Sequence, residues 1–415
     1  MRSGVALRVA PDGTVKPVPA ELAPAGPDTR RFPGTLLPGL VDAHVHSGLV
    51  DLGTVRAGGI AAVWDLGGVP AAVRELAERA EASSRHTRRA AGGEQTDRAD
   101  AAGHRARRAA GGEQTERADA ASHRARRAAS GEQTERAEAP NRAAAGERAD
   151  RAEPVGHRAA GGEDAEAGRS RYAPAKLPRI RYAGPFLIAP GGYPSDRSWA
   201  APGSWREIHS PADAGAAVAE VWSAGAGLVK VTAHTGGPQL PHPTLRALVD
   251  AAHASGLPVV VHAEGAGTVA AAYTAGADLL AHTPWTERLD DSLLRACAAR
   301  MCWLSTLDIH GWGEPDPAQE IAVDNLRRFK AYGGTIRYGT DLGNGPLPPG
   351  INTREIRALQ SAGLTPDDVL GVMTDSDSIT EISWVPGGLD LDPERFADVL
   401  ATARVVDDDV HPTSP

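Results

Sequence analysis

Residues 38–46 read PGLVDAHVH, an apolar run that ends in two histidines two positions apart. Near-continuous runs of Val, Leu and Ile are typical of strands that are buried on both faces, as in parallel sheets. Seven further runs of this kind follow along the chain: GIAAVWDLGG (59–68), PRIRYAG (178–184), GLVKVTA (227–233), LPVVVHAE (257–264), DLLAHT (278–283), MCWLSTLD (301–308) and TIRYGTDLG (335–343). The sequence therefore predicts eight strands.

Ala-rich stretches separate these runs, such as PADAGAAVAEVWSAG (211–225) and HPTLRALVDAAHASG (242–256). The second has apolar residues at helical spacing and closes on a glycine, which is typical of a helix end. Alternation of strand and helix eight times over predicts an α/β fold, the closed (β/α)₈ TIM barrel. We assign the barrel to residues 38–84 and 171–375, although the segment after His46 is short for a first helix.

Residues 85–170 interrupt the barrel with a repeat of 19 residues, RRAA[GS]GEQT[DE]RA, which begins at Arg88, Arg107 and Arg126. Val155 is its only large apolar residue, so the segment has almost nothing to bury and cannot offset the entropy of ordering. Its 17 Arg and 15 Asp plus Glu are nearly balanced, unlike the basic arm of a nucleic-acid-binding protein. We expect a disordered low-complexity insertion. A protein-interaction arm is the alternative.

The two ends of the chain differ from the barrel. Residues 1–37 contain short alternating pieces broken by Pro and Gly, and we expect them to contribute the N-terminal part of a small β-domain. Residues 376–415 form a divergent tail, WVPGGLDLDPERFADVLATARVV in its central part, that would complete a reduced version of this β-domain.

Charge and composition exclude several classes of protein. A net charge of −9 does not favour binding to nucleic acid or to an anionic membrane surface. No run reaches the roughly 20 apolar residues of a membrane span, and no signal peptide is visible. The two cysteines, Cys297 and Cys302, do not form a disulfide framework, so we expect a cytoplasmic protein. Its partner is expected to be a small molecule, and a homo-oligomer is left open.

Reactive residues stand where the predicted strands end. Active sites of such barrels lie at the carboxyl ends of the strands, and residues two apart on a strand share a face. His44 and His46 close the first strand, and further candidates lie at four later strands: Lys230, His262, His282 and Asp341. Histidine and carboxylate side chains that converge on one rim are typical of a divalent metal site.

These motifs resemble those of the amidohydrolase superfamily. PGLVDAHVH, GLVKV, VVVHAE, LLAHTPW and YGTDLG are similar in order and spacing to the branch that includes imidazolonepropionases and Xaa-Pro dipeptidases, as is IRYAGPFLIAPGGY. The resemblance covers roughly residues 30–345 apart from the repeat. It implies that His44, His46 and Asp341 hold one metal and that His262 and His282 hold a second, with two zinc ions bridged by a carboxylated Lys230.

The resemblance also implies a reaction. A metal-bound hydroxide would attack a carbonyl carbon, and Asp341 would act as general acid and base in breaking a C–N bond of a cyclic amide or a dipeptide. In an alternative, Lys230 is unmodified and pairs with Asp341, and the site is that of a one-metal deaminase or imidazolone-type hydrolase. A third hypothesis is a non-catalytic scaffold that binds a partner through the repeat. His234, Trp285 and His310 follow strand ends and are weaker candidates for binding the substrate.

Overall fold

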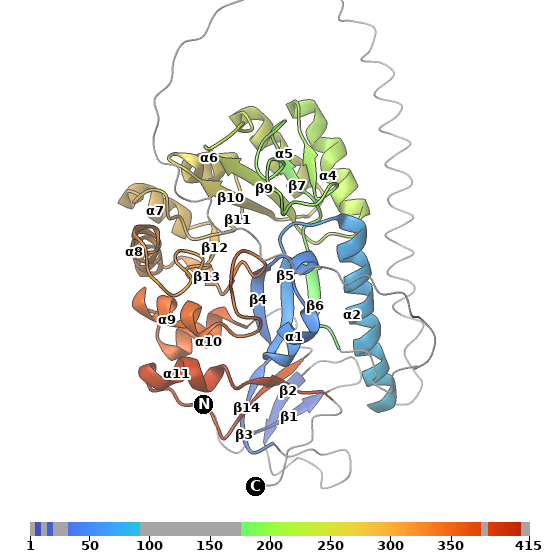
Figure 1. Cartoon of the computed structure of the whole chain (residues 1–415), viewed down its shortest axis with the longest axis vertical. Coiled ribbons are helices and arrows are strands. Elements are labelled where there is room, and N and C mark those ends of the chain that lie inside the picture. Colours follow the sequence, from blue (N-terminus) through green and yellow to red (C-terminus); the bar gives the residue numbers. More distant parts are fainter. Residues whose placement is uncertain (1–4, 10–14, 20–31, 92–175, 375–380, 408–415) are drawn as a thin grey trace, which may run out of the picture. The chain divides into compact units, whose positions relative to one another are not determined.

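The computed structural model describes residues 5–9, 15–19, 32–91, 176–374 and 381–407 (Figure 1). The chain divides into two compact units, residues 1–88 with 163–415 and residues 89–162. Of the second unit only residues 89–91 are described, so most of the predicted insertion lies outside the described residues. Among the described helices, none combines the length and the hydrophobicity that crossing a membrane requires.

Ten parallel strands of the described chain form two sheets. The larger has the order β13-β12-β11-β10-β9-β7-β8, and the smaller has the order β4-β5-β6. The strands are β4 (Leu40–Val45), β5 (Ile60–Asp65), β6 (Arg179–Tyr182), β7 (Phe186–Ile188), β8 (Trp205–Glu207), β9 (Val229–His234), β10 (Val259–Glu264), β11 (Leu279–Leu280), β12 (Cys302–Leu304) and β13 (Thr335–Arg337).

Each of the eight predicted runs contains a strand, but the strands do not form one continuous eight-stranded ladder. Between β6 and β7 the ladder is interrupted at Gly184, which has a φ of 74°, and at Pro185, which has no N–H to donate. The strands β7 and β8 were not predicted, because FLI and WRE are too short to show a pattern. On the other side, the Ala43 N–H donates to the Tyr338 carbonyl at 2.9 Å, and the His46 N–H donates to the Leu342 carbonyl at 2.8 Å. These bonds join the region after β13 to β4.

Helices follow the strands, as predicted. They are α1 (Leu52–Ala57), α2 (Pro70–Ala91), α4 (Ala214–Ser223), α5 (His242–Ala254), α6 (Thr268–Ala275), α7 (Asp291–Ala298), α8 (Pro317–Ala331), α9 (Thr353–Ser361), α10 (Pro366–Val372) and α11 (Pro393–Leu400). The first is only six residues long, which accounts for the short segment after His46. Figure 1 shows α2 on one side of β4–β6 and α9 and α10 on the other.

Residue 85, the predicted start of the insertion, lies within helix α2. Helix α2 continues to Ala91, through the first residues of the repeat. Ala and Arg are strong helix formers, which accounts for the helix over residues 88–91.

Strands from both ends of the chain form the small β-element. Strand β14 (Ile382–Pro386) pairs antiparallel with β3 (Gly34–Pro38) and with β15 (Arg404–Val405), while β1 (Val5–Val9) and β2 (Val15–Pro19) form a separate hairpin. The buried Arg56 ties α1 to the C-terminal segment, since its guanidinium pairs with Asp407 at 2.7 Å and with Glu381 at 3.2 Å.

Buried apolar side chains form two clusters, and alternate strand residues divide between them. Leu40 of β4 belongs to the larger cluster, which the helices share. Val41 and Ala43, on the opposite face of the same strand, belong to a smaller one. The smaller cluster is completed by Trp64, Leu66, Ala183, Leu228, Val260, Leu279, Ala281 and Leu304. It therefore gathers residues from successive strands of both sheets on one shared face.

Candidate metal centre

The six predicted metal ligands are all buried, and each lies in a parallel strand or shortly after one. His44 lies in β4 and His46 directly after it, Lys230 lies in β9, His262 lies in β10, and His282 and Asp341 follow β11 and β13. Because the carboxyl ends of parallel strands meet at one edge, residues distant in the sequence come together there.

The carboxylate of Asp341 faces two histidines. Its Oδ1 is 2.9 Å from Nε2 of His44 and 3.1 Å from Nε2 of His46. Each imidazole also places Nδ1 on a backbone carbonyl, His44 on Ala281 at 2.8 Å and His46 on Gly67 at 3.2 Å. A neutral imidazole has one N–H, which Nδ1 uses, so each Nε2 presents a lone pair to an anionic oxygen. A cation or a proton must lie between them.

The environment of His44 disfavours a proton as that cation. Burial lowers the pKa of His44 to about 4, against the opposing effect of Asp341. For His46, burial also lowers the pKa, but the hydrogen bond and the charge of Asp341 raise it more. A neutral imidazole whose second nitrogen donates to a carbonyl is the form that ligates metals. The donor set therefore fits a divalent cation.

His282 completes this group. One ligand atom from each of His44, His282 and Asp341 can lie within 4.8 Å of the others. Nδ1 of His282 contacts the hydroxyl of Thr306 at 3.0 Å, which leaves Nε2 for a metal. Burial lowers the pKa of His282 well below its usual value, so the ring is neutral.

His262 belongs to a second group, with His234 and Glu264. Its Nε2 is 2.9 Å from Oε2 of Glu264, and Nδ1 of His234 is 3.0 Å from the same oxygen. The rings of His262 and His282 are nevertheless only 4.9 Å apart, centre to centre. With Nε2 on the carboxylate, His262 has Nδ1 left for a metal.

Lys230 is fully buried among these groups. Burial lowers its pKa to about 7, although the charges of Asp341 and Asp65 oppose this. Its charge in turn lowers the pKa of the four histidines at positions 44, 46, 262 and 282. An amine with this pKa is partly neutral at pH 7, and the neutral amine is the form that reacts with CO₂.

The backbone is strained beside the site. In the described part of the chain, the non-glycine residues with positive φ are Thr306 (44°), Trp312 (49°) and Asp341 (61°), and all three follow β12 or β13. Left-handed backbone is unfavourable for Thr and Trp and tolerable for Asp. Asn344 further restrains Asp341, because its Nδ2 donates to Oδ2 at 2.8 Å. Strain held by surrounding contacts is typical of functional sites.

Asp42 is a supporting residue that motif comparison missed. It is buried, and its Oδ1 accepts from the N–H groups of His44 and Thr340, while its Oδ2 accepts from the Thr340 hydroxyl at 2.5 Å. Asp42 therefore fixes the backbone of His44 relative to the residue before Asp341. Its position two residues before His44 places it on the same strand face, which was the available signal.

The three weaker candidates surround the histidines. The Trp285 ring is 5.4 Å from that of His282 and 5.1 Å from that of His310. His234 lies beside Glu264, and burial lowers the pKa of His310 to about 4. They form part of the wall of the site, and their role in substrate binding stays a prediction.

Aromatic residues of the segment after β7 form another part of the wall. Tyr193 stacks on His262 at 4.9 Å, and Trp199 lies 5.9 Å from His46 and 6.1 Å from Phe186. The sequence analysis did not select these residues, because single aromatics in a loop carry no pattern. The stretch IRYAGPFLIAPGGY, which ends at Tyr193, was noted only for its resemblance.

Glu355 of α9 supports the loop after β12 and makes a pH-dependent contribution to stability. Its Oε2 accepts from the N–H of Asp308 at 2.7 Å, and burial raises its pKa from 4.5 to about 8. At pH values between 4.5 and about 8, the Glu355 carboxyl group is therefore protonated in the folded protein and ionised in the unfolded chain. We therefore expect this residue to lower the free energy of unfolding by up to about 1.4 kcal/mol per pH unit as the pH rises from 4.5 to 8.

Urea denaturation of wild type and Glu355→Gln at pH 5 and pH 8 measures this contribution. The variant should be relatively more stable at pH 8 than at pH 5. An equal difference at the two pH values would contradict the raised pKa.

No protein-family model matches the sequence, and no curated protein matches it. Solved structures do match the fold. A Xaa-Pro dipeptidase with bound methionine superposes with a TM-score of 0.55 at 16% identity, covering 90% of this chain and 85% of that one. Ochratoxinase from A. niger gives 0.62 at 14%, covering 97% and 90%. An amidohydrolase gives 0.59 at 15%, covering 97% and 92%. The chain thus shares the fold of these hydrolases, in agreement with the expectation from the motifs.

Proposed function

We propose that the protein is a metal-dependent amidohydrolase that hydrolyses a C–N amide bond of a small molecule, such as a cyclic amide or a dipeptide. One observation carries the proposal: the Asp341 carboxylate faces two imidazole nitrogens whose partner nitrogens are already committed to carbonyl groups. The names of the similar structures, a dipeptidase and an amidohydrolase among them, agree with this class of reaction.

A closed (β/α)₈ barrel is part of the proposal. The hydrogen bonds from Ala43 and His46 to the segment after β13 support closure on one side. The smaller apolar cluster supports it as well, because alternate residues of successive strands share one interior. In such a barrel this cluster is the core beneath the metal centre.

Two divalent ions, which we take to be zinc, fit the donor set. His44, His46 and Asp341 would hold one, and His262 through Nδ1 and His282 through Nε2 would hold the other. Lys230 would bridge them after its neutral amine reacts with CO₂ to give a carbamate, an anionic ligand with two oxygens. When bound, the ions supply a water of lowered pKa and polarise the carbonyl of the substrate.

The chain's own residues position the groups and move the proton. Asp341 accepts a proton from the attacking water and delivers it to the departing nitrogen. Asn344 and the left-handed backbone aim its carboxylate, and Asp42 holds the neighbouring strand. The aromatic wall excludes bulk water, which strengthens electrostatic interactions inside.

A one-metal enzyme is the second candidate, a deaminase or imidazolone-type hydrolase with unmodified Lys230. The observation in its favour is that His262 contacts Glu264, apart from the group formed by His44, His282 and Asp341. The number of bound ions distinguishes the two candidates.

Metal analysis and a substrate panel test the proposal. Protein purified with zinc and bicarbonate should contain about two ions per chain and should hydrolyse members of a panel of N-acyl amino acids, Xaa-Pro dipeptides and cyclic ureides. One ion per chain would favour the second candidate. Well under one ion, with no hydrolysis after zinc and bicarbonate are added, would contradict both.

The exposed side chain of Trp199, which lies beside His46, predicts where the apolar part of the substrate binds. In the described part of the chain the exposed large apolar residues are Leu49, Trp199 and Trp222. Trp199 contacts the His46 ring, whereas Trp222 lies in α4. We expect Trp199→Ala to raise KM about tenfold for amides with a bulky apolar group, because their contact area is lost.

Trp222→Ala is the matched control and should leave KM unchanged. Steady-state kinetics with apolar and small acyl groups measures both variants. An equal effect of the two substitutions would exclude a substrate contact at Trp199.

A further inference from the structure

The loop after β11 carries Trp285 but has no regular structure of its own. Residues 283–289 connect His282 to α7, and the Trp285 ring lies 5.4 Å from the ring of His282 and 5.9 Å from that of His262. A loop that places a large ring beside predicted metal ligands needs outside support, because loops are otherwise the most mobile part of a fold.

Asn325 of α8 supplies that support with every hydrogen-bonding position of its side chain. Its Nδ2 donates to the carbonyls of Pro284 at 2.9 Å and Glu287 at 2.8 Å. Its Oδ1 accepts from the Leu289 N–H at 3.1 Å and from Nη2 of Arg328 at 2.9 Å. The residue is completely buried. A side-chain amide has two donors and two acceptor sites, and all four are used.

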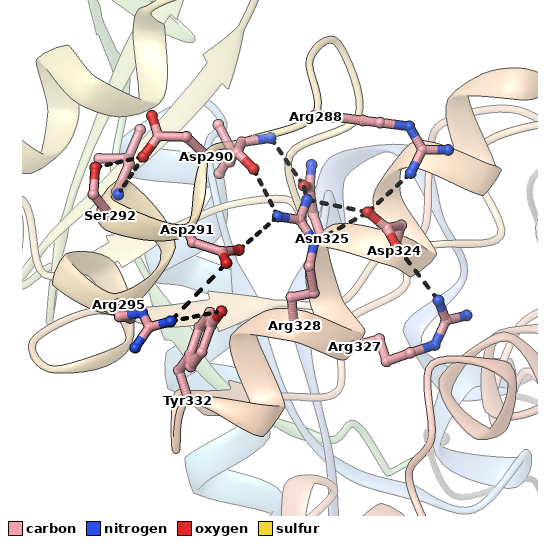
Figure 2. A network of polar contacts seen from close by, with 12 residues as sticks. Arg288, Asp290, Asp291, Ser292, Arg295, Asp324, Asn325, Arg327, Arg328 and Tyr332 are labelled. Atoms are coloured by element: carbon pink, nitrogen blue, oxygen red, sulfur yellow. Dashed lines mark hydrogen bonds and ion pairs between the residues drawn. The ribbon is translucent and has the colours of Figure 1, made fainter.

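Arg328, one turn along α8, adds a second tie to the same loop. Its Nη1 donates to the Leu289 carbonyl at 2.8 Å and also contacts Asp291 at the start of α7. Figure 2 shows these bonds, together with the pairs that join Asp324 to Arg288 and to Arg327. The two ends of the loop are thus fastened to one helix.

The loop in turn holds the loop after β10. The Thr286 hydroxyl accepts from the Gly265 N–H, and Oε1 of Glu287 accepts from the Gly267 N–H, each at 2.9 Å. Gly265 directly follows Glu264, the partner of His262. A continuous series of hydrogen bonds therefore runs from α8 through the loop of Trp285 to the residues beside His262.

We propose that Asn325 is a positioning residue: it sets the place of Trp285 in the loop after His282 and, through Thr286 and Glu287, the place of the loop that follows His262 and Glu264. Its effect on the site rests on the proposed function, while its effect on the loop does not. Asparagine is required because aspartate offers no donors to the two carbonyls and alanine offers neither donors nor acceptors.

Asn325→Asp is the test substitution, since it keeps the shape of the side chain and removes both donors. We expect hydrogen exchange of the amides in 285–289 to become at least about tenfold faster and zinc binding, measured by competition with a chelator, to weaken about tenfold. Arg328→Lys, which retains the charge but loses the planar fork, should change both in the same direction by less. If Asn325→Asp fails to fold, Arg328→Lys provides the test in its place.

Arg327→Ala is the matched control, because Arg327 lies on the same helix in the same network and does not contact the loop. It should leave both measurements at the wild-type values. The proposal would be overturned if hydrogen exchange of the loop amides in Asn325→Asp were as slow as in the wild type. It would also be overturned if Arg327→Ala accelerated this exchange as much as Asn325→Asp does. If the wild-type protein binds no zinc, the proposed metal centre is wrong. Hydrogen exchange in Asn325→Asp then still shows whether Asn325 holds the loop.

A double-mutant cycle then separates positioning from general stability. On a Trp285→Ala background, Asn325→Asp should raise KM by less than it does in the wild-type background, because the part of its action that passes through Trp285 is already lost. Fully additive effects on KM would show that Asn325 acts elsewhere and would refute its role in placing the ring.

Discussion

Lys230→Ala should lower kcat/KM by about three orders of magnitude and reduce the bound metal from two ions to one or fewer. The reason is the position of the amine. Lys230 is buried beside Asp341 and the four histidines, and its pKa near 7 makes the neutral amine available for carboxylation at physiological pH. Without the bridging carbamate, two cations would repel each other across the centre with no anion between them.

Chemical rescue and a second variant identify the cause of the loss. Formate or acetate should restore part of the activity of Lys230→Ala, because a small carboxylate can occupy the place of the carbamate. Lys230→Arg, which keeps a cation that cannot be carboxylated, should remain inactive with or without them. Kinetics with metal analysis checks both. Full activity of Lys230→Ala with one bound ion would establish the one-metal candidate instead.

Asp341→Asn should lower kcat by about 10²–10⁴, the range for loss of a general acid and base. Asparagine suits this test because it tolerates the left-handed backbone at position 341, where φ is 61°, so the local conformation is retained. The same change removes the anion that His44 and His46 share, so the metal held there should also bind more weakly.

Asn344→Ala is a useful companion to this variant. It removes the hydrogen bond to Oδ2 of Asp341 and leaves the carboxylate in place. A smaller decrease in kcat, with metal content unchanged, is expected. Wild-type kcat in Asp341→Asn would exclude Asp341 from the proton transfer, and metal content and kcat measured together distinguish a lost ligand from a lost base.

Much of the site could be predicted from local pattern. His44 and His46 are two residues apart on a strand, so they share a face whatever the rest of the chain does. His262 and Asp341 stand at the ends of apolar runs, and the carboxyl ends of parallel strands lie at one edge. The motifs predicted a fold that solved structures of a dipeptidase and an amidohydrolase share with this chain at low sequence identity.

Other features depend on contacts between residues far apart in the sequence, which no local sequence pattern predicts. Asp42 reaches Thr340 across 298 residues, and Asn325 reaches Pro284 across 41. The extension of α2 into the repeat and the break of the ladder at Pro185 also escaped the sequence analysis, because element ends respond to single residues. The pKa of Lys230 is another such feature, since it results from burial by elements far apart in the chain.

The amino-acid sequence by itself determined the eight longer apolar strands, the helices between them and which reactive residues stand near strand ends, because periodicity and side-chain chemistry are local properties. The tertiary structure alone decided which imidazole nitrogen faces Asp341, that His262 contacts Glu264, and that one buried asparagine fastens the loop of Trp285. These contacts depend on interatomic distances of a few ångströms and on removal of the side chains from water. Both arise only when distant segments of the chain pack together.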